Sequence, residues 1–576
     1  MPENIYDPLT DYAEKFAPRF KEVCAETFAD LAAEAKVDVD ANRKTCAKLY
    51  DLRDRLSKVK NRLGNWKFLR ALLWVLAALA VLYVIIEWNA MTETTLAAFS
   101  GGFTAAMALQ ILLAYPKVRK LKTAKAGLEA EADAKEKEAW TQMEPLNDLY
   151  DWDIFSRMMT KTVPRLEFDH FFTTQRLADL TQTYGWDGTF NRDRSVIYSH
   201  SGLINGNPFV ICRTRKMEMG QKSYTGTLTI SWTSREYGSD GKWHSVRHTQ
   251  VLTATVTAPF PEYYEKTRLL YGNTAAPDLV FNRYHSGIAG HERSHAYRKT
   301  LRELRKKARD LEHSDFAMLT NEEFEVAFDT RDRNDNQQFA LLFTPLAQQA
   351  MLRLLKDGTV GYGDDFDFHK SRMINMVVPG HMQDIDLDMD PGQFRDFDYD
   401  KAEEKFKTRN ANYFRAIYFS MAPLLCIPMY QQIRPRSAIY GTDMPRHSCF
   451  WEHEALANFW GEDRFKAGDC VTHCILKTEQ EDQAGDSSRI VVHAYGYSRR
   501  QRLTMVPTWG GDGRMHNVPV YWDEYLPVEG VGGISMKEDN SDQPSDETQV
   551  QRLSHISTLL GDSNLTLYRR HIASSV

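Results

Sequence analysis

Two apolar runs stand out from an otherwise polar chain. The first extends from Phe68 to Ile86 with one charged residue, Arg70, and the second extends from Thr94 to Tyr115 with none. Each run has roughly 20 residues, enough for a helix to cross a hydrocarbon core of about 30 Å. The pattern predicts a two-helix transmembrane hairpin, and a pair of buried core helices is the alternative.

Basic residues lie on one side of this hairpin only. The connector Glu87–Glu93 contains two glutamates and no Lys or Arg. The basic flanks are Lys58, Lys60, Arg62, Lys67 and Arg70 before the first run, and Lys117, Arg119, Lys120, Lys122 and Lys125 after the second. Because basic flanks stay in the cytoplasm, the sequence predicts a multi-pass membrane protein, with the lipid bilayer as a partner and both termini cytoplasmic.

A helical seam precedes the first run. Apolar residues repeat at alternating spacings of three and four at Leu49, Leu52, Leu56, Val59, Leu63 and Trp66. Asp38 or Asp40 is expected to cap this helix, and Lys117–Glu144 is expected to form a second one. We expect the two helices to form an antiparallel stalk that continues the hairpin. A parallel coiled coil between two copies of the chain is the alternative.

Small residues in the second run form two helix rows. The rows are Ala97, Gly101 and Ala105, and Ala98, Gly102 and Ala106. Small residues four apart let helix backbones approach closely in lipid. We expect these rows to pack either against the first span or against another copy of the chain. Association between copies, through the rows and the seam, predicts a homo-oligomer.

Alternating patterns replace helical spacing from about Trp152 to Phe281. Residues 209–211, 227–232 and 251–256 are rich in β-branched side chains, and Gly238–Gly241 is a turn signal between the last two. This favours an antiparallel meander with one buried face. Helices are expected over Ala402–Ala422 and over Arg298–Arg309. The second of these helices is strongly basic, and it is either a solvated linker or a contact to an anionic membrane face.

These patterns predict an α+β membrane protein with a mixed helix and antiparallel-sheet cytoplasmic head. The expected regions are N-terminal cytoplasmic helices (1–66), a transmembrane hairpin (67–115), a returning stalk helix (116–145), a β-rich domain (146–285), a basic helix with an α/β core (286–400), a C-terminal α+β region (401–536), and an acidic linker and tail (537–576).

A motif in the α/β core extends this prediction. Asn321–Phe328 (NEEFEVAF) leads through Asp335 to Phe339–Pro345 (FALLFTP), then to Leu346 and Met351–Leu355. Thr344 is expected to cap a helix that has Pro345 at its first position. Over residues 320–380 this resembles an uncharacterised bacterial family, the domain-of-unknown-function family numbered 3137. The resemblance implies a two-span membrane hairpin with a cytoplasmic domain, located in the inner (cytoplasmic) membrane of a bacterium. From gene context, it also implies a LemA-type membrane partner. It implies no chemistry, because the family has no established catalytic residues.

Composition argues against two classes of protein. A net charge of −6 and a pI near 6.3 lack the basic footprint of a nucleic-acid-binding protein. The N-terminus is polar and acidic, unlike a secretory signal, and the seven cysteines show no framework spacing. No cofactor is expected.

Two groups of residues are candidate metal ligands. His291, Glu292 and His295 match H-E-x-x-H, in which two histidines on one helix face bind zinc and the glutamate acts as base. The second group is His447, Cys449, His453, Cys470, His473 and Cys474. Zinc-binding cysteines usually lie in pairs on turns, whereas Cys470 and Cys474 are expected on a strand, so we interpret this group as core thiols and hydrogen-bonded histidines.

The favoured hypothesis is a membrane-anchored cytoplasmic assembly or scaffold protein that self-associates and has no catalytic activity. Arg293 and the polar residues around it are untypical of a zinc-protease helix. For this reason, a membrane-anchored zinc-dependent hydrolase that uses His291, Glu292 and His295 is kept only as the alternative hypothesis.

Overall fold

The computed structural model of the protein describes residues 5–86, 101, 102, 104, 108, 112, 114–239, 241–310, 315–432, 447–485, 487–539 and 566–576. The chain divides into two compact units. Unit 1 comprises Met1–Cys24, Asp151–Asp390 and Asn410–Val576, and unit 2 comprises Ala25–Tyr150 and Pro391–Arg409. The helices α2 (Ala17–Ala35) and α12 (Tyr399–Leu425) contribute to both units.

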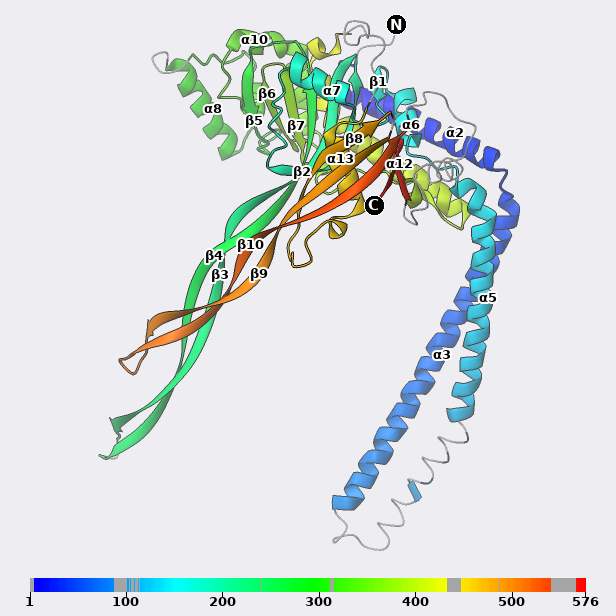
Figure 1. Ribbon diagram of the computed structural model, residues 1–576, viewed down its shortest axis with the longest axis vertical. Helices are drawn as coiled ribbons and strands as arrows, with labels where there is room; N and C mark the ends of the chain where they lie inside the picture. Colours follow the sequence, from blue (N-terminus) through cyan, green and yellow to red (C-terminus); the bar gives the residue numbers. More distant parts are fainter. Residues whose placement is uncertain are drawn as a thin grey trace. The chain divides into compact units, whose positions relative to one another are not determined.

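Unit 2 is built around two antiparallel helices, α3 (Val39–Ile86) and α5 (Tyr115–Asn147), with the helical turn η5 (Pro391–Phe394) (Figure 1). The carboxylate of Asp38 accepts a hydrogen bond of 2.9 Å from the Ala41 amide and caps α3. Ion pairs join the two helices, from Arg53 to Glu136 (2.8 Å) and from Lys60 to Glu129 (3.2 Å). The later residue of α3 pairs with the earlier residue of α5, as expected for antiparallel helices.

The predicted transmembrane hairpin is wrong. Within the described residues, no helix is both long enough and apolar enough to cross a membrane. The helix α3 carries charge as far as Arg70, and the described helix from Arg70 to Ile86 is shorter than the roughly 20 residues of a full span. The predicted second span, 94–115, lies mostly outside the described residues. The predicted membrane fold class and the predicted inner-membrane localisation depended on this hairpin and are therefore wrong as well.

Unit 1 contains two antiparallel sheets. A seven-stranded sheet has the order β1-β2-β3-β4-β7-β6-β5, and a five-stranded sheet has the order β11-β12-β10-β9-β8. The strands are β1 (Leu166–Phe168), β2 (Arg194–Ile204), β3 (Asn207–Tyr237), β4 (Trp243–Gly272), β5 (Val280–Arg283), β6 (Phe366–Ser371), β7 (Ile374–Pro379), β8 (Ile475–Ala484), β9 (Ser487–Trp509), β10 (Met515–Glu538), β11 (Thr566–Arg569) and β12 (Ile572–Ser575).

Helices and helical turns cover and connect these sheets. They are α1 (Pro8–Asp11), η1 (Tyr12–Phe16), α6 (Ile154–Thr162), α7 (Thr174–Ala178), η3 (Asp179–Thr183), α8 (His295–Arg309), α9 (Glu322–Phe328), α10 (Asn336–Leu342), α11 (Pro345–Lys356), η4 (Gly380–Met382), η6 (Pro428–Gln431), α13 (Phe450–Trp460) and η8 (Glu462–Arg464). The predicted cap at Thr344 is confirmed, because its side chain accepts a hydrogen bond from the Ala347 amide at the start of α11.

The helix α13 lies at the centre of unit 1. Leu456, Ala457 and Trp460 pack in one core with buried residues of β8, β9, β10 and β12. Trp451 and Ala455 pack in another core with buried residues of β2, β3, β4 and β7. The helix is therefore buried between the two sheets and presents apolar side chains to both of them.

Two long hairpins extend beyond the sheets and pack against each other (Figure 1). In β3–β4 the pairing continues to Tyr237 opposite Trp243, and in β9–β10 it continues to Trp509 opposite Met515. We call residues 217–237, 243–263, 497–509 and 515–527 the arm. Its core consists of Ile230, Leu252, Ala254, Val518 and Val520, flanked by Tyr224, Leu228, Trp232, Val256 and Val506. The predicted turn at Gly238–Gly241 is confirmed as the tip of the first hairpin.

Candidate functional site

The H-E-x-x-H residues do not share a helix face. His291 and Glu292 lie in turns that precede α8, and His295 is the first residue of that helix. Glu292 instead forms an ion pair of 2.9 Å with Lys356. This geometry lacks the paired-histidine helix face that the zinc-hydrolase alternative requires.

The second group of predicted ligands is dispersed over separate partners. The histidines pair as His447 with Glu538 (2.9 Å), His453 with Ser448 (2.9 Å) and His473 with Glu462 (2.7 Å). Cys470 and Cys474 are buried with their Sγ atoms 3.6 Å apart, and burial raises the pKa of Cys474 to about 12. A thiol that holds its proton this strongly is a poor metal ligand and a poor nucleophile.

The predicted association residues are placed unevenly. Leu49, Leu56 and Leu63 are buried in unit 2, whereas Leu52 and Val59 are half-buried. Gly101 and Gly102 are helical and exposed, with no atom within 4 Å of an added Cβ. Ala97, Ala98, Ala105 and Ala106 lie outside the described residues.

The turn between β11 and β12 is a candidate site that the sequence did not indicate. Its residues Arg569, Arg570 and His571 are buried, and Arg570 and His571 adopt the left-handed backbone region with φ of 40° and 61°. A turn made of such polar residues normally lies in solvent. We call these three residues the C-terminal turn.

Two carboxylates, the buried Glu452 and the partly buried Asp388, neutralise the two arginines of this turn. Glu452 on α13 accepts hydrogen bonds from Arg569 (2.9 Å) and Arg570 (3.2 Å). Asp388 accepts a further bond of 2.8 Å from Arg569. Burial lowers the pKa of Arg570, but Glu452 and the acidic groups around it raise the pKa by more, so the guanidinium keeps its charge. Residues 384–390 form a loop that brings Asp388 to this position.

The third residue of the C-terminal turn belongs to a group of potential metal ligands. His571 Nε2 lies 2.5 Å from an Asp153 oxygen, and His170 Nδ1 lies 3.6 Å from the other oxygen. The imidazole rings of His170 and His571 are 4.0 Å apart between centroids. One ligand atom from each of the three side chains lies within 4.8 Å of the others. We call Asp153, His170 and His571 the triad.

Asp153 is expected to make stability depend on pH in the acid range. Burial raises the pKa of its carboxyl, but His170 and His571 lower the pKa by more, to well below the ordinary value of 3.8. The ionised carboxylate therefore stabilises the fold above about pH 4, and this contribution is lost as the pH falls further. Urea titrations between about pH 5 and about pH 3 should show a steeper loss of unfolding free energy in the parent than in Asp153→Asn. Equal slopes would contradict this assignment.

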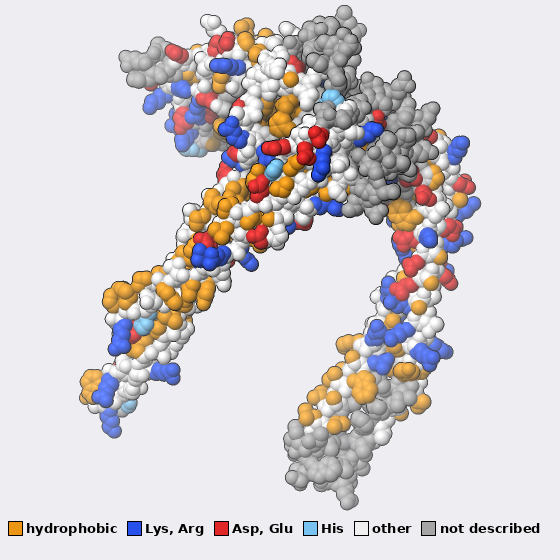
Figure 2. All heavy atoms as spheres, viewed as in Figure 1, with side chains coloured by type: hydrophobic (Ala, Val, Ile, Leu, Met, Phe, Trp, Pro, Cys, Tyr) orange, Lys and Arg blue, Asp and Glu red, His pale blue; other side chains and the backbone are white. Residues whose placement is uncertain are grey.

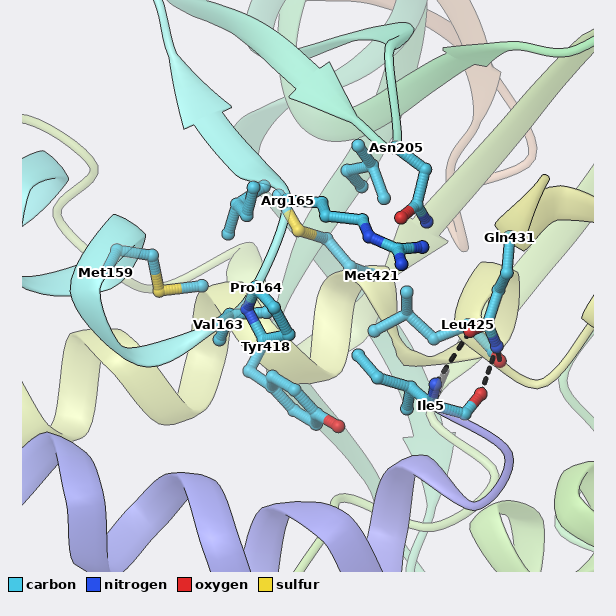
Figure 3. A pocket seen from close by; sticks show the side chains of 12 residues that line it. Ile5, Met159, Val163, Pro164, Arg165, Asn205, Tyr418, Met421, Leu425 and Gln431 are labelled. Carbon is cyan, nitrogen blue, oxygen red and sulfur yellow. Dashed lines mark hydrogen bonds between the residues drawn. The ribbon is translucent and has the colours of Figure 1, made fainter. Parts of the chain in front are cut away.

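Two hollows in unit 1 differ in what they can hold. One is lined by residues such as Ile5, Met159 and Gln431, and its volume of about 20 Å³ admits a water molecule rather than a substrate (Figure 3). The other, of about 430 Å³, opens at the base of the arm between Met217 and Tyr495.

The arm carries exposed apolar side chains on both hairpins. They are Met219, Tyr237, Trp243, Val251, Leu503, Met505, Trp509, Met515, Tyr521 and Leu526. Figure 2 shows apolar side chains over much of the visible face of the arm. In the described part of the chain, the outer edges of the arm strands pair with no further strand, because β2, β7, β8 and β12 pair only at the base of the hairpins.

Unit 1 thus contains two candidate sites, a buried triad of ligand-type residues and an exposed apolar arm. Both are assigned from geometry and chemistry alone. No known protein family, curated protein or solved structure matches the chain.

Proposed function

We propose that the protein is a non-catalytic assembly protein that self-associates, and that the arm carries this association. The observation that supports the proposal most strongly is the combination, on one narrow structure, of exposed aromatic side chains and unpaired strand edges. Each of these features is a recognised basis for protein–protein contact.

The first feature is the apolar surface. Trp243 and Trp509, at the two hairpin tips, are 66% and 67% exposed. Tryptophan, tyrosine and methionine are enriched at protein interfaces, where they supply large contact areas. Large apolar patches on a protein surface usually mark interaction sites. The arm already has its own buried core, so these outward side chains are not needed to hold the two hairpins together.

The second feature is the backbone. A strand at the edge of a sheet presents unpaired N–H and C=O groups, which can pair with a strand of another chain. Pairing in β3–β4 continues over residues 217–237 without a β-bulge, so the outer edge of β3 is long and regular. Antiparallel strands of two identical chains can meet across a two-fold axis, which closes the assembly as a dimer.

The third feature is the charge of the arm. Its four strand segments contain six basic and five acidic residues. Arg502 and Glu524 form an ion pair within the arm at 2.7 Å. A nearly neutral surface does not repel a second copy of itself, and it lacks the field that would attract nucleic acid.

The proposal predicts that the hairpin tips determine oligomeric state. The double variant Trp243→Ser with Trp509→Ser removes two exposed side chains and should leave the fold intact. Light scattering at matched concentration should give a larger mass for the parent than for this variant, because interface tryptophans contribute strongly to binding.

The matched control is Leu341→Ser, which removes an exposed apolar side chain (64%) from α10 and should leave the mass unchanged. A parent that is monomeric over the accessible concentration range, or a tip variant with the mass of the parent, would overturn the proposal.

A further inference from the structure

We propose that Asp153, His170 and His571 bind one divalent transition-metal ion of the zinc type, and that this ion fastens the C-terminal hairpin β11–β12 to the body of unit 1. The site is separate from the arm, so the inference does not depend on the proposed self-association.

The donor set fits such an ion. Zinc in proteins takes imidazole nitrogen and carboxylate oxygen at about 2.0–2.2 Å, so the ligand atoms of a tetrahedral site lie roughly 3.3 Å apart. The oxygens of Asp153 lie 2.5 Å and 3.6 Å from the nitrogens of His571 and His170, on either side of that spacing. Two imidazoles in three ligands favour zinc and its neighbours over magnesium or calcium, which prefer oxygen.

Local folding holds the three ligands in place. Asp153 directly precedes α6, but its side chain makes no hydrogen bond to that helix and is directed to the histidines instead. His170 follows β1, and its side chain is 45% exposed, so it can move toward an ion. His571 is held in the C-terminal turn, whose two arginines are fixed by Glu452 and Asp388.

Of the three carboxylates around the C-terminal turn, only Asp153 has no arginine as a partner in the described structure. In the described structure, Glu452 and Asp388 meet the guanidiniums of Arg569 and Arg570, whereas Asp153 meets only imidazoles. A cation at this carboxylate is either a proton shared with His571 or a metal ion that displaces it. The solvent-exposed side of His170 leaves room for water as a fourth ligand.

The test uses the full chain and zinc itself. After the protein is stripped with a chelator and dialysed, titration with zinc should show one ion bound per chain and a melting midpoint raised by a few degrees. His170→Ala should fold like the parent, since this side chain is half-exposed, and it should lose both the bound zinc and the thermal shift. Asp153→Asn should also lose both.

The matched control is His493→Ala, which removes a histidine that also pairs with a carboxylate, Glu529 at 2.7 Å, but belongs to no three-ligand group among the described residues. It should keep the zinc and the shift. Limited proteolysis of the parent should also become slower at the C-terminal hairpin when zinc is added. No zinc bound by the parent, or equal zinc binding by the parent and His170→Ala, would overturn the proposal.

Discussion

Replacement of Glu452 by alanine is expected to lower the free energy of unfolding by about 3–5 kcal/mol. This carboxylate accepts hydrogen bonds from both Arg569 and Arg570, and all three side chains are buried. Its loss leaves Arg570 without its acidic hydrogen-bond partner between the two sheets, where an unpaired charge is costly. Urea denaturation followed by tryptophan fluorescence would measure the effect, because Trp451 lies next to Glu452 in the core.

The control for this experiment is a carboxylate in an exposed ion pair. Glu524→Ala breaks the pair with Arg502 on the arm, where both side chains are partly exposed. Its expected cost is about 0–1 kcal/mol. If Glu452→Ala costs no more than Glu524→Ala, the C-terminal turn is not held by buried charge.

Replacement of Gly226 by valine is expected to separate the two hairpins of the arm. A Cβ at this position would lie 2.1 Å from the carbonyl oxygen of Pro519, and a backbone atom cannot move aside as a side chain can. Overpacking of this kind costs about 1–3 kcal/mol. We expect lower thermal stability of the arm and, under the proposed function, weaker self-association, as light scattering would show.

Thr225→Val is the matched control for this variant. Thr225 is the neighbouring residue on β3 and is exposed, so the same side chain is placed on the outward face. It should change neither stability nor mass. A Gly226→Val protein with the stability of the parent would show that the two hairpins are not packed as a two-layer arm.

Local signals in the sequence were interpreted correctly where they depended on neighbouring residues. The caps at Asp38 and Thr344 and the turn at Gly238 are such cases, since each needs only a few residues to form its hydrogen bonds or its backbone shape. The helix expected over Ala402–Ala422 is likewise confirmed within α12.

Strand length was not predictable in the same way. Residues 227–232 and 251–256 were recognised, but β3 and β4 extend far beyond them through polar sequence such as Lys222 and Ser223. A strand that is exposed on one face and along its outer edge has no long apolar run, so its length follows from its partner strand rather than from its own composition. The apolar runs did not lead to a membrane span, because no helix among the described residues is both long enough and apolar enough to cross a membrane.

The C-terminal turn was not predictable because its members are distant in sequence. Arg569 meets Asp388 and Glu452 only after both sheets and α13 have assembled. On its own, a turn that contains two arginines and a histidine indicates a solvated surface. The one available signal was on α13, where Glu452 and Glu454 lie within an otherwise apolar segment and so need buried partners.

Hydrogen exchange of the full chain is the most direct test of self-association through the arm. Amides on the outer edges of residues 217–237 and 243–263 face no strand within the described chain, so they should exchange fast in a monomer. We predict that their exchange slows as protein concentration rises, and that it does not slow in Trp243→Ser with Trp509→Ser, while the amides of β2 behave alike in both proteins. Arm exchange that is independent of concentration in the parent and equal to that of the variant would contradict the account.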